Sequence, residues 1–371
     1  MYSVNQPWDP LRVCVVGRSY SPEFYKFIEN PRLRELFQKI ARETEEDYQA
    51  IIKKLEEFGV QTIRPYAPEV QLDEYLTANK RIPGPISMTP RDQMIMIGNN
   101  FFVFPYDRIA KKASGKANLE VNANDLIKNT GEISWWSPIV DAVAKQDNPI
   151  IADRYQDVLK HIPANGITRI GNDLYFGRRK HHGQLEDETL IAIQKLQQEF
   201  FSSYRCHWIE SDGHIDGFFC PVKPGLILSI RDEHTYTETF PGWEVVYLEG
   251  ESWGKILPFL DLKKKNQGKW WIKGSEYDNE LIDYVETWLG DWVGYCEESV
   301  FDVNILVINE HNVMVSGYNK QAFDAFERHG VTPHIVPFRH RYFWDGGLHC
   351  VTLDLHRDGA KQDFFPDRGS N

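Results

Sequence analysis

A cysteine close to the C-terminal end of the chain has neighbours that suit a nucleophile. Cys350 follows the glycine pair Gly346 and Gly347 and begins an alternating run typical of a strand. Glycines have no side chain and let a ligand approach the backbone closely. Because a thiol reacts as its thiolate, a cation or a proton acceptor is required nearby. A buried core cysteine is the alternative, and the glycine pair favours the nucleophile.

A histidine and an aspartate form a second candidate pair. His214 and Asp216 are two positions apart, so on a strand they face the same side of the sheet. An imidazole paired with a carboxylate suits proton transfer beside a positively charged substrate. The motif is short, and a surface histidine in a salt bridge is the alternative interpretation.

A charged pair comes directly before an apolar segment. Arg91 and Asp92 follow Pro90 and precede the apolar run that begins at Met94. Such a pair is often only the solvated start of a strand. It can also offer a carboxylate to a cation at the mouth of a barrel-like centre.

The elements that carry these residues include a recurring hairpin pattern. In each copy an apolar run meets a tight polar turn, and a second apolar run follows. These hairpins are predicted at residues 94–103, 167–176, 218–228 and 305–315. Their spacing is irregular, which excludes a short-period solenoid.

Helices are predicted between the hairpins, and their order indicates the α/β class. Residues 11–17, 44–58 and 60–64 form a strand, a helix and a strand. Further helices are predicted at residues 186–204 and 320–329. Two interpretations stay open: one hairpin-and-helix unit repeated around a common centre, or a mixed α+β domain with unrelated hairpins.

The charge of the chain limits its partners. Its 371 residues include 54 acidic and 42 basic ones, a formal net charge of −12. A surface of this sign repels nucleic acid. No apolar stretch is long enough to span a membrane, and no signal peptide is recognisable, so a cytoplasmic protein is expected. We expect one domain over residues 1–371, with a frayed tail at 360–371.

The cysteines do not form a disulfide or zinc framework. Their number, five, is odd, and no pair has the CxxC spacing. No cluster with metal-ligand spacing is visible elsewhere.

Four segments, taken together and in order, resemble the glycine amidinotransferase family of the pentein superfamily. The first three are residues 90–92 with 96–99, residues 214–216 with 224–229, and residues 304–306 with 313–315. The fourth is His349-Cys350 followed by Thr352, Asp354, Arg357 and Gly359, and it is the most specific. The resemblance covers the chain from about Trp8 to Gly359.

The resemblance implies a fold and a reaction. The fold would be an α/β propeller of five hairpin-and-helix modules around a pseudo-fivefold axis, with the active site in the central channel. The reaction would move the amidino group of L-arginine to an acceptor amine such as glycine and release ornithine, and it would need neither a metal nor an organic cofactor. The expected partners are these small molecules, without nucleic acid or membrane, and a homodimer is one open assembly.

The resemblance also implies a role for each candidate residue. Cys350 would attack the guanidinium carbon and carry the amidino group. His214 would protonate the departing amine and then deprotonate the incoming one. Asp92 and Asp216 would hold the guanidinium N–H groups through charge-assisted hydrogen bonds. Arg91 is placed with the substrate-binding residues.

Two positions depart from the family pattern. Pro163 stands where the family has an acid that orients the histidine, so either Asn165 orients His214 or an acid comes from elsewhere. We predict Asn165 for this role. The arginine that binds the substrate carboxylate is also displaced, and Arg231 can serve because a shift of two residues keeps the same face of a strand.

Three functions follow from these patterns. Amidino transfer is favoured by the ending that contains Thr352, Asp354 and Arg357. A guanidine hydrolase of the same superfamily, in which water attacks the intermediate, is the second. A catalytically weak guanidine-binding protein is the third, and the proline at position 163 is its only support.

Overall fold

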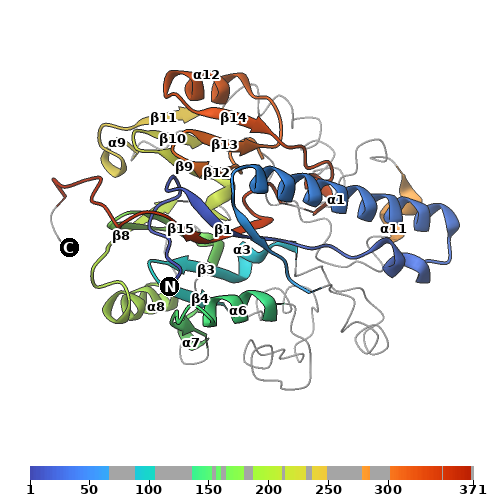
Figure 1. The fold of residues 1–371 in the computed structure, drawn as a ribbon, viewed down its shortest axis with the longest axis horizontal. Helices are drawn as coiled ribbons and strands as arrows, with labels where there is room; N and C mark the ends of the chain where they lie inside the picture. Colours follow the sequence, from blue (N-terminus) through green and yellow to red (C-terminus); the bar gives the residue numbers. More distant parts are fainter. Residues whose placement is uncertain are drawn as a thin grey trace.

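The computed structural model describes most of the chain. The described residues are 1–66, 88–104, 136–152, 156–159, 164–178, 187–210, 214–230, 236–248, 278–284, 301–344 and 346–368. They form five three-stranded sheets arranged around the middle of the molecule (Figure 1).

Each sheet is built in the same way. An inner strand pairs antiparallel with a middle strand, and the middle strand pairs parallel with an outer strand. A helix connects the middle strand to the outer one, because parallel neighbours need a crossover connection. The described chain therefore confirms the expected five hairpin-and-helix units.

The bounds of the first three units in chain order follow the hairpins predicted from the sequence. The first is β3 (Met94–Ile97), β4 (Asn100–Val103), α6 (Ser137–Ala144) and β5 (Ile150–Ile151). The second is β6 (Ile167–Ile170), β7 (Asp173–Arg178), α8 (Asp187–Glu199) and β8 (Arg205–Glu210). The third is β9 (Phe219–Lys223), β10 (Leu226–Ser229), α9 (Tyr236–Thr239) and β11 (Glu244–Tyr247).

The two remaining units close the ring. The fourth is β12 (Leu306–Asn309), β13 (Asn312–Val315), α12 (Lys320–Arg328) and β14 (Thr332–Ile335). The fifth joins both ends of the chain: β15 (Thr352–Arg357) pairs with β1 (Leu11–Val16), which continues through α1 (Pro31–Glu57) to β2 (Gln61–Ile63). In Figure 1 the blue strand β1 and the red strand β15 lie side by side in the centre.

Short helices complete the described elements. Those that precede inner strands are α3 (Pro90–Gln93), η5 (Ala164–Gly166), η6 (Ile215–Gly217) and α13 (Arg341–Trp344). The others are η1 (Pro22–Phe27), α7 (Gln156–Leu159) and α11 (Asn279–Tyr284).

The sequence patterns explain most element boundaries. Three predicted hairpin turns contain a glycine in the left-handed region, with φ of 55° at Gly98, 59° at Gly171 and 89° at Gly225. Strand β3 is apolar at every position because both of its faces are buried. The helix predicted at residues 44–58 is longer than expected: α1 begins at Pro31, where the Asn30 side chain caps the free N–H groups of Arg32 and Leu33.

The C-terminal tail is packed against the body of the protein, so the expectation of a frayed segment is wrong for residues 360–368. The Phe364 ring meets Trp8 edge to face, with centroids 4.9 Å apart. Phe365 is buried, and its carbonyl accepts a hydrogen bond of 2.9 Å from Arg205. Two adjacent aromatic side chains supply the apolar surface that anchors this polar segment.

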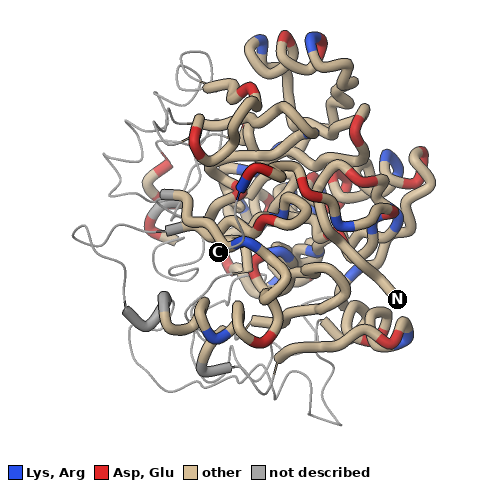
Figure 2. The backbone as a smooth tube through the Cα atoms, turned by 90° about the vertical axis from the view of Figure 1, so that its left-hand side faces the viewer, with Lys and Arg blue, Asp and Glu red and all other residues tan. Residues whose placement is uncertain are grey.

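Two further properties of the described residues are the length and polarity of their helices and the distribution of charge along the backbone. None of the helices in the described ranges is long and apolar enough to cross a membrane. Acidic and basic residues are interspersed along the described backbone (Figure 2).

Candidate active site

Polar residues stand at equivalent places in all five units, just before each inner strand. They are Asp92 before β3, Asn165 before β6, Asp216 before β9, Asn304 before β12 and Cys350 before β15. The five inner strands surround one axis, so their entrances lie close together. Hydrogen bonds between the units confirm this convergence: Asn165 bonds to Asp92, and both Asn304 and Asp216 contact Cys350.

Cys350 is buried between two polar neighbours. Its exposed fraction is 1%, and it lies in the turn that leads into β15. The Sγ atom accepts a hydrogen bond of 3.0 Å from the side-chain amide of Asn304 and donates one of 3.5 Å to Oδ2 of Asp216. The thiol thus faces a carboxylate that repels its ionised form and an amide that favours it.

Asp216 is held on one side only. Its Oδ2 accepts a hydrogen bond of 2.7 Å from Nδ1 of His349, whereas its buried Oδ1 has no partner among the described residues. Burial opposes ionisation of Asp216, but the hydrogen bond from His349 and the charges of His349, His214 and Arg91 together outweigh it and lower the pKa. The pKa of His349 is lowered by burial and by the charge of Arg91. The lowered pKa of Asp216 favours an ionised carboxylate, and the lowered pKa of His349 favours a neutral imidazole that donates from Nδ1.

Among the described residues Asp92 lies within ion-pair distance of His214, whereas Asn165 bonds to Asp92, which corrects the prediction that Asn165 orients His214 directly. The Asp92 Oδ1 atom lies 3.9 Å from Nδ1 of His214. Asn165 donates its side-chain N–H to the same Oδ1 at 2.7 Å. The acid therefore comes from a neighbouring unit, and the described bond of Asn165 is to this acid. The Oδ1 atom of Asn165 is buried without a partner among the described residues.

The pKa of Asp92 is shifted in the opposite direction to that of Asp216. Burial raises the pKa of Asp92, and the negative charge of Asp216 adds to the rise. His214 and the hydrogen bond from Asn165 oppose this shift without overcoming it. Two carboxylates in one site thus differ in their tendency to ionise, which is typical of sites that transfer protons.

The described bonds of Arg91 are all to the protein, and its predicted role in substrate binding stays a prediction. Its Nε donates to the carbonyls of His349 at 3.0 Å and Thr352 at 3.1 Å, and its Nη2 donates to Asp354 at 3.1 Å. The side chain is 4% exposed. Arg91 therefore supports the turn that carries Cys350 from behind.

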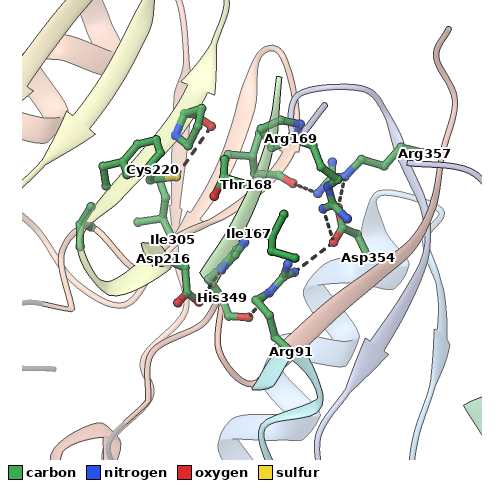
Figure 3. Close-up of a pocket in the computed structure, with 15 residues that line it drawn as sticks. Arg91, Ile167, Thr168, Arg169, Asp216, Cys220, Ile305, His349, Asp354 and Arg357 are labelled. Carbon is green, nitrogen blue, oxygen red and sulfur yellow. Dashed lines mark hydrogen bonds and ion pairs between the residues drawn. The ribbon is translucent and has the colours of Figure 1, made fainter. Parts of the chain in front are cut away.

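Asp354 is the centre of a fully paired cluster deeper in the ring (Figure 3). Its two oxygens accept hydrogen bonds from Arg91, Arg169 and Arg357 over 2.8–3.1 Å. Burial raises the pKa of Asp354, but the three guanidinium groups outweigh it and hold the pKa well below its usual range. The motif residues Asp354 and Arg357 are therefore structural.

The pocket in Figure 3 lies along the inner strands rather than around Cys350. Its lining comes mainly from β6, β9, β15 and the segment leading into β12, and it also includes Asp216, His349 and Arg91. Cys350 and His214 are not among the described lining residues. The reaction is therefore assigned to the surroundings of Cys350. The pocket adjoins this site through the shared residues Asp216 and His349.

Two predicted positions lie outside the described residues. They are Arg231, predicted to bind a carboxylate, and Pro163, which replaces the family's acid. The roles inferred for these positions stay predictions.

Two site residues were missed as candidates. His349 precedes the nucleophile, and Asn304 begins the segment that resembles the family's NVL motif. The equivalent placement of a polar residue before every inner strand is the signal that would have found Asn304. No sequence signal indicated that His349 would bond to Asp216.

The arrangement of acceptors around Cys350 suits a planar cation. No group of three or more histidines, cysteines and acids within the described ranges could hold a metal. Within the described part of the site, Oδ1 of Asp216 and Oδ1 of Asn165 are buried acceptors without a partner, and a guanidinium offers several N–H donors in one plane. Such a cation beside Cys350 also favours the thiolate.

Comparison with known proteins supports the resemblance, although no protein-family model matches the chain. A putative inosamine-phosphate amidinotransferase of Streptomyces griseus is 23% identical over 382 residues, which cover 98% of this chain and 99% of the relative. The mitochondrial glycine amidinotransferase of Danio rerio is 23% identical and covers 97% of this chain and 84% of its own length.

Solved structures confirm the fold. SxtG, an amidinotransferase of Microseira wollei, superposes with a TM-score of 0.63 at 17% identity and covers 98% of this chain and 99% of its own. The inosamine-phosphate amidinotransferase of Streptomyces griseus gives 0.62 with the same coverage. DDAH of Pseudomonas aeruginosa gives 0.51 at 10% identity, covering 92% of this chain and 98% of its own. The predicted pentein-type α/β propeller is therefore correct.

Proposed function

We propose that the chain is an enzyme like the amidinotransferases it resembles, and that it moves the amidino group of L-arginine to an acceptor amine through Cys350. The observation that carries the proposal is the contact between Sγ of Cys350 and the half-paired carboxylate of Asp216 at 3.5 Å. A cysteine and a carboxylate with one free oxygen fit a guanidinium that is held and attacked at the same place.

The first half of the reaction forms a covalent intermediate. A guanidinium donates N–H groups to Oδ1 of Asp216 and to the Asn165 carbonyl, and its charge stabilises the Cys350 thiolate. The thiolate forms a C–S bond to the central carbon. The bond from that carbon to the side-chain nitrogen of arginine breaks, and the imidazolium of His214 gives its proton to that nitrogen. Ornithine leaves, and the amidino group stays on sulfur.

The second half reverses these steps with another amine. The acceptor forms a C–N bond to the amidino carbon, and the C–S bond breaks to return the thiolate. His214 takes the proton that the acceptor loses, so the enzyme ends as it began. Asp92, 3.9 Å from His214, stabilises the imidazolium that is present before the first half and is restored after the second.

The acceptor is proposed from the relatives, which are named for glycine and for an inosamine phosphate. Both compounds present a primary amine beside an anionic group. Arg231, close after β10 (Leu226–Ser229), is proposed to bind the carboxylate of a substrate. A homodimer, a cytoplasmic location and a single catalytic domain stay predictions from the sequence.

Mass spectrometry of the products tests the proposal. The protein is incubated with L-arginine and, separately, with glycine, an inosamine phosphate and other primary amines. Ornithine together with the guanidino form of one amine is the expected result. Citrulline in place of ornithine would indicate a hydrolase, and unchanged arginine in every mixture would contradict the proposal.

A trapping experiment identifies the residue that carries the group. The protein is mixed with arginine alone, quenched in acid and digested. The peptide that contains Cys350 is expected to gain the mass of one amidino group, and the peptide that contains Cys206 is the matched control. An adduct on any other residue would contradict the assignment of Cys350.

A further inference from the structure

Within the described part of the chain, Asn304 makes four hydrogen bonds around the nucleophile. Its Oδ1 accepts from the backbone N–H groups of His349 at 2.9 Å and Cys350 at 3.1 Å. Its Nδ2 donates to Sγ of Cys350 at 3.0 Å and to the carbonyl of Asp216 at 3.2 Å. The side chain is fully buried. One amide thus joins the cysteine, its backbone and the segment that carries Asp216.

The orientation of this amide is determined by its surroundings. The two backbone N–H groups can only donate, so they require the oxygen of Asn304 on their side. The side-chain NH₂ must then point to Cys350 and Asp216, where it meets two acceptors. All four groups are satisfied in this orientation, whereas the flipped one would place donor against donor.

The backbone leaves room for Asn304 at one glycine. A Cβ atom at Gly347 would lie 2.5 Å from Oδ1 of Asn304 and 2.8 Å from its Cγ. Any larger residue at position 347 would displace the amide from the turn. Gly347, the second glycine of the pair noted in the sequence, therefore makes room for the side chain of Asn304. That side chain contacts Sγ of Cys350.

We propose that Asn304 is a catalytic residue that stabilises the Cys350 thiolate through its side-chain N–H. The thiolate needs a stabilising donor because the Asp216 carboxylate, 3.5 Å from sulfur on its other side, repels its negative charge. An amide provides a donor without adding a charge that would compete with a cationic substrate for Asp216. The proposal rests on Cys350 as the nucleophile of the proposed function.

The test measures the pKa of the Cys350 thiol in the absence of substrate. The ultraviolet absorbance of the thiolate is titrated in each protein and in its Cys350→Ala counterpart, and the difference belongs to Cys350. In Asn304→Asp the Oδ1 contacts to the backbone are kept, but an oxygen replaces the donor beside sulfur. We expect the thiol pKa to rise by about one to two pH units.

A second variant and a control separate this role from a structural one. In Asn304→Ser the serine side chain is too short to reach sulfur, so the pKa of the Cys350 thiol should also rise. This variant provides the test if Asn304→Asp does not fold. Asn319→Ala is the control, since Asn319 is a buried asparagine that caps α12. It should lower the melting temperature and leave the thiol pKa unchanged.

The outcomes are distinct from those of the proposed function. A wild-type thiol pKa in either folded Asn304 variant would overturn the proposal. An equal rise in Asn319→Ala would also overturn it, because general loosening would then explain the effect. A missing amidino adduct on Cys350 would remove the proposed function, while the thiol pKa of the Asn304 variants would still report on the hydrogen bond.

Discussion

Two buried carboxylates close to Cys350 differ in how fully they are paired. Asp354 accepts hydrogen bonds at both oxygens from three arginines. Asp216 accepts one bond from a histidine side chain and keeps a buried oxygen without a partner among the described residues. Both residues are at most 5% exposed, so burial does not distinguish them.

The difference in pairing assigns Asp354 to the scaffold and Asp216 to the binding site. A carboxylate surrounded by guanidinium groups has no capacity left for a ligand, and its cluster fixes the strands around it. A buried oxygen without a donor is costly unless something else satisfies it. Unused hydrogen-bonding capacity therefore indicates where a cationic substrate binds, and the paired cluster indicates what holds that place in shape.

The largest expected effect is on the chemistry at Cys350. Cys350→Ser should lower turnover by at least about a thousandfold, because a hydroxyl is far less ionised than a thiol near neutral pH. The fold should persist, since the two side chains differ by one atom. Ornithine release and circular dichroism measure the two properties. Cys206→Ser is the matched control, and substantial turnover in Cys350→Ser would move the nucleophile elsewhere.

The scaffold should respond in stability. Asp354→Asn leaves three buried arginines without their shared carboxylate, and removing one partner of a buried ion pair costs about 3–5 kcal/mol. Denaturant titration should show this loss in the free energy of unfolding. A variant as stable as the wild type would show that the cluster contributes nothing net to folding.

The site should respond in activity instead. Asp216→Asn removes the charge that faces the guanidinium and replaces an acceptor by a donor. Loss of one charge-assisted hydrogen bond should lower kcat/KM for arginine about ten- to a hundredfold. Its unfolding free energy should change much less than in Asp354→Asn. Equal losses of stability in the two variants would remove the distinction between scaffold and site.

The hairpins of the fold were predictable because their signals are local, whereas their arrangement around one centre was predicted only from the family resemblance. The hairpin turns need glycine or asparagine, and the inner strands are short apolar runs, so both are visible in the sequence. The length of α1 was underestimated because its start depends on the cap at Asn30 rather than on a long apolar face. The packed tail was missed because two phenylalanines among polar residues carry no periodicity.

The site was predictable only in part, because pairing between distant residues is not visible in a sequence. Motif resemblance named Cys350 and Asp216, which the structure brings into contact. It also placed Arg91 with the substrate, although the described hydrogen bonds of Arg91 are to two backbone carbonyls and Asp354. Neighbouring charges look equivalent in a sequence, and only the positions of their partners separate them.

The smallest expected effect is a difference in the pH dependence of stability. Burial raises the folded-state pKa of Asp92, whereas the arginines hold that of Asp354 well below its usual range. Above about pH 3.9 the unfolded chain releases the Asp92 proton more readily than the folded protein, so ionisation of Asp92 reduces stability as pH rises. For Asp354 the sign is reversed, and its stabilisation is lost as pH falls.

Asp92→Asn tests this difference. At neutral pH the variant should be more stable than the wild type, by the order of 1 kcal/mol, because it removes a half-buried charge whose pKa burial raises despite the contacts with Asn165 and His214. The gain should disappear as pH falls below about 4, where Asp92 is protonated in both states. Over the same range the deficit of Asp354→Asn should shrink. Denaturant titrations at several pH values measure both trends, and a less stable Asp92→Asn at neutral pH would place Asp92 with the scaffold.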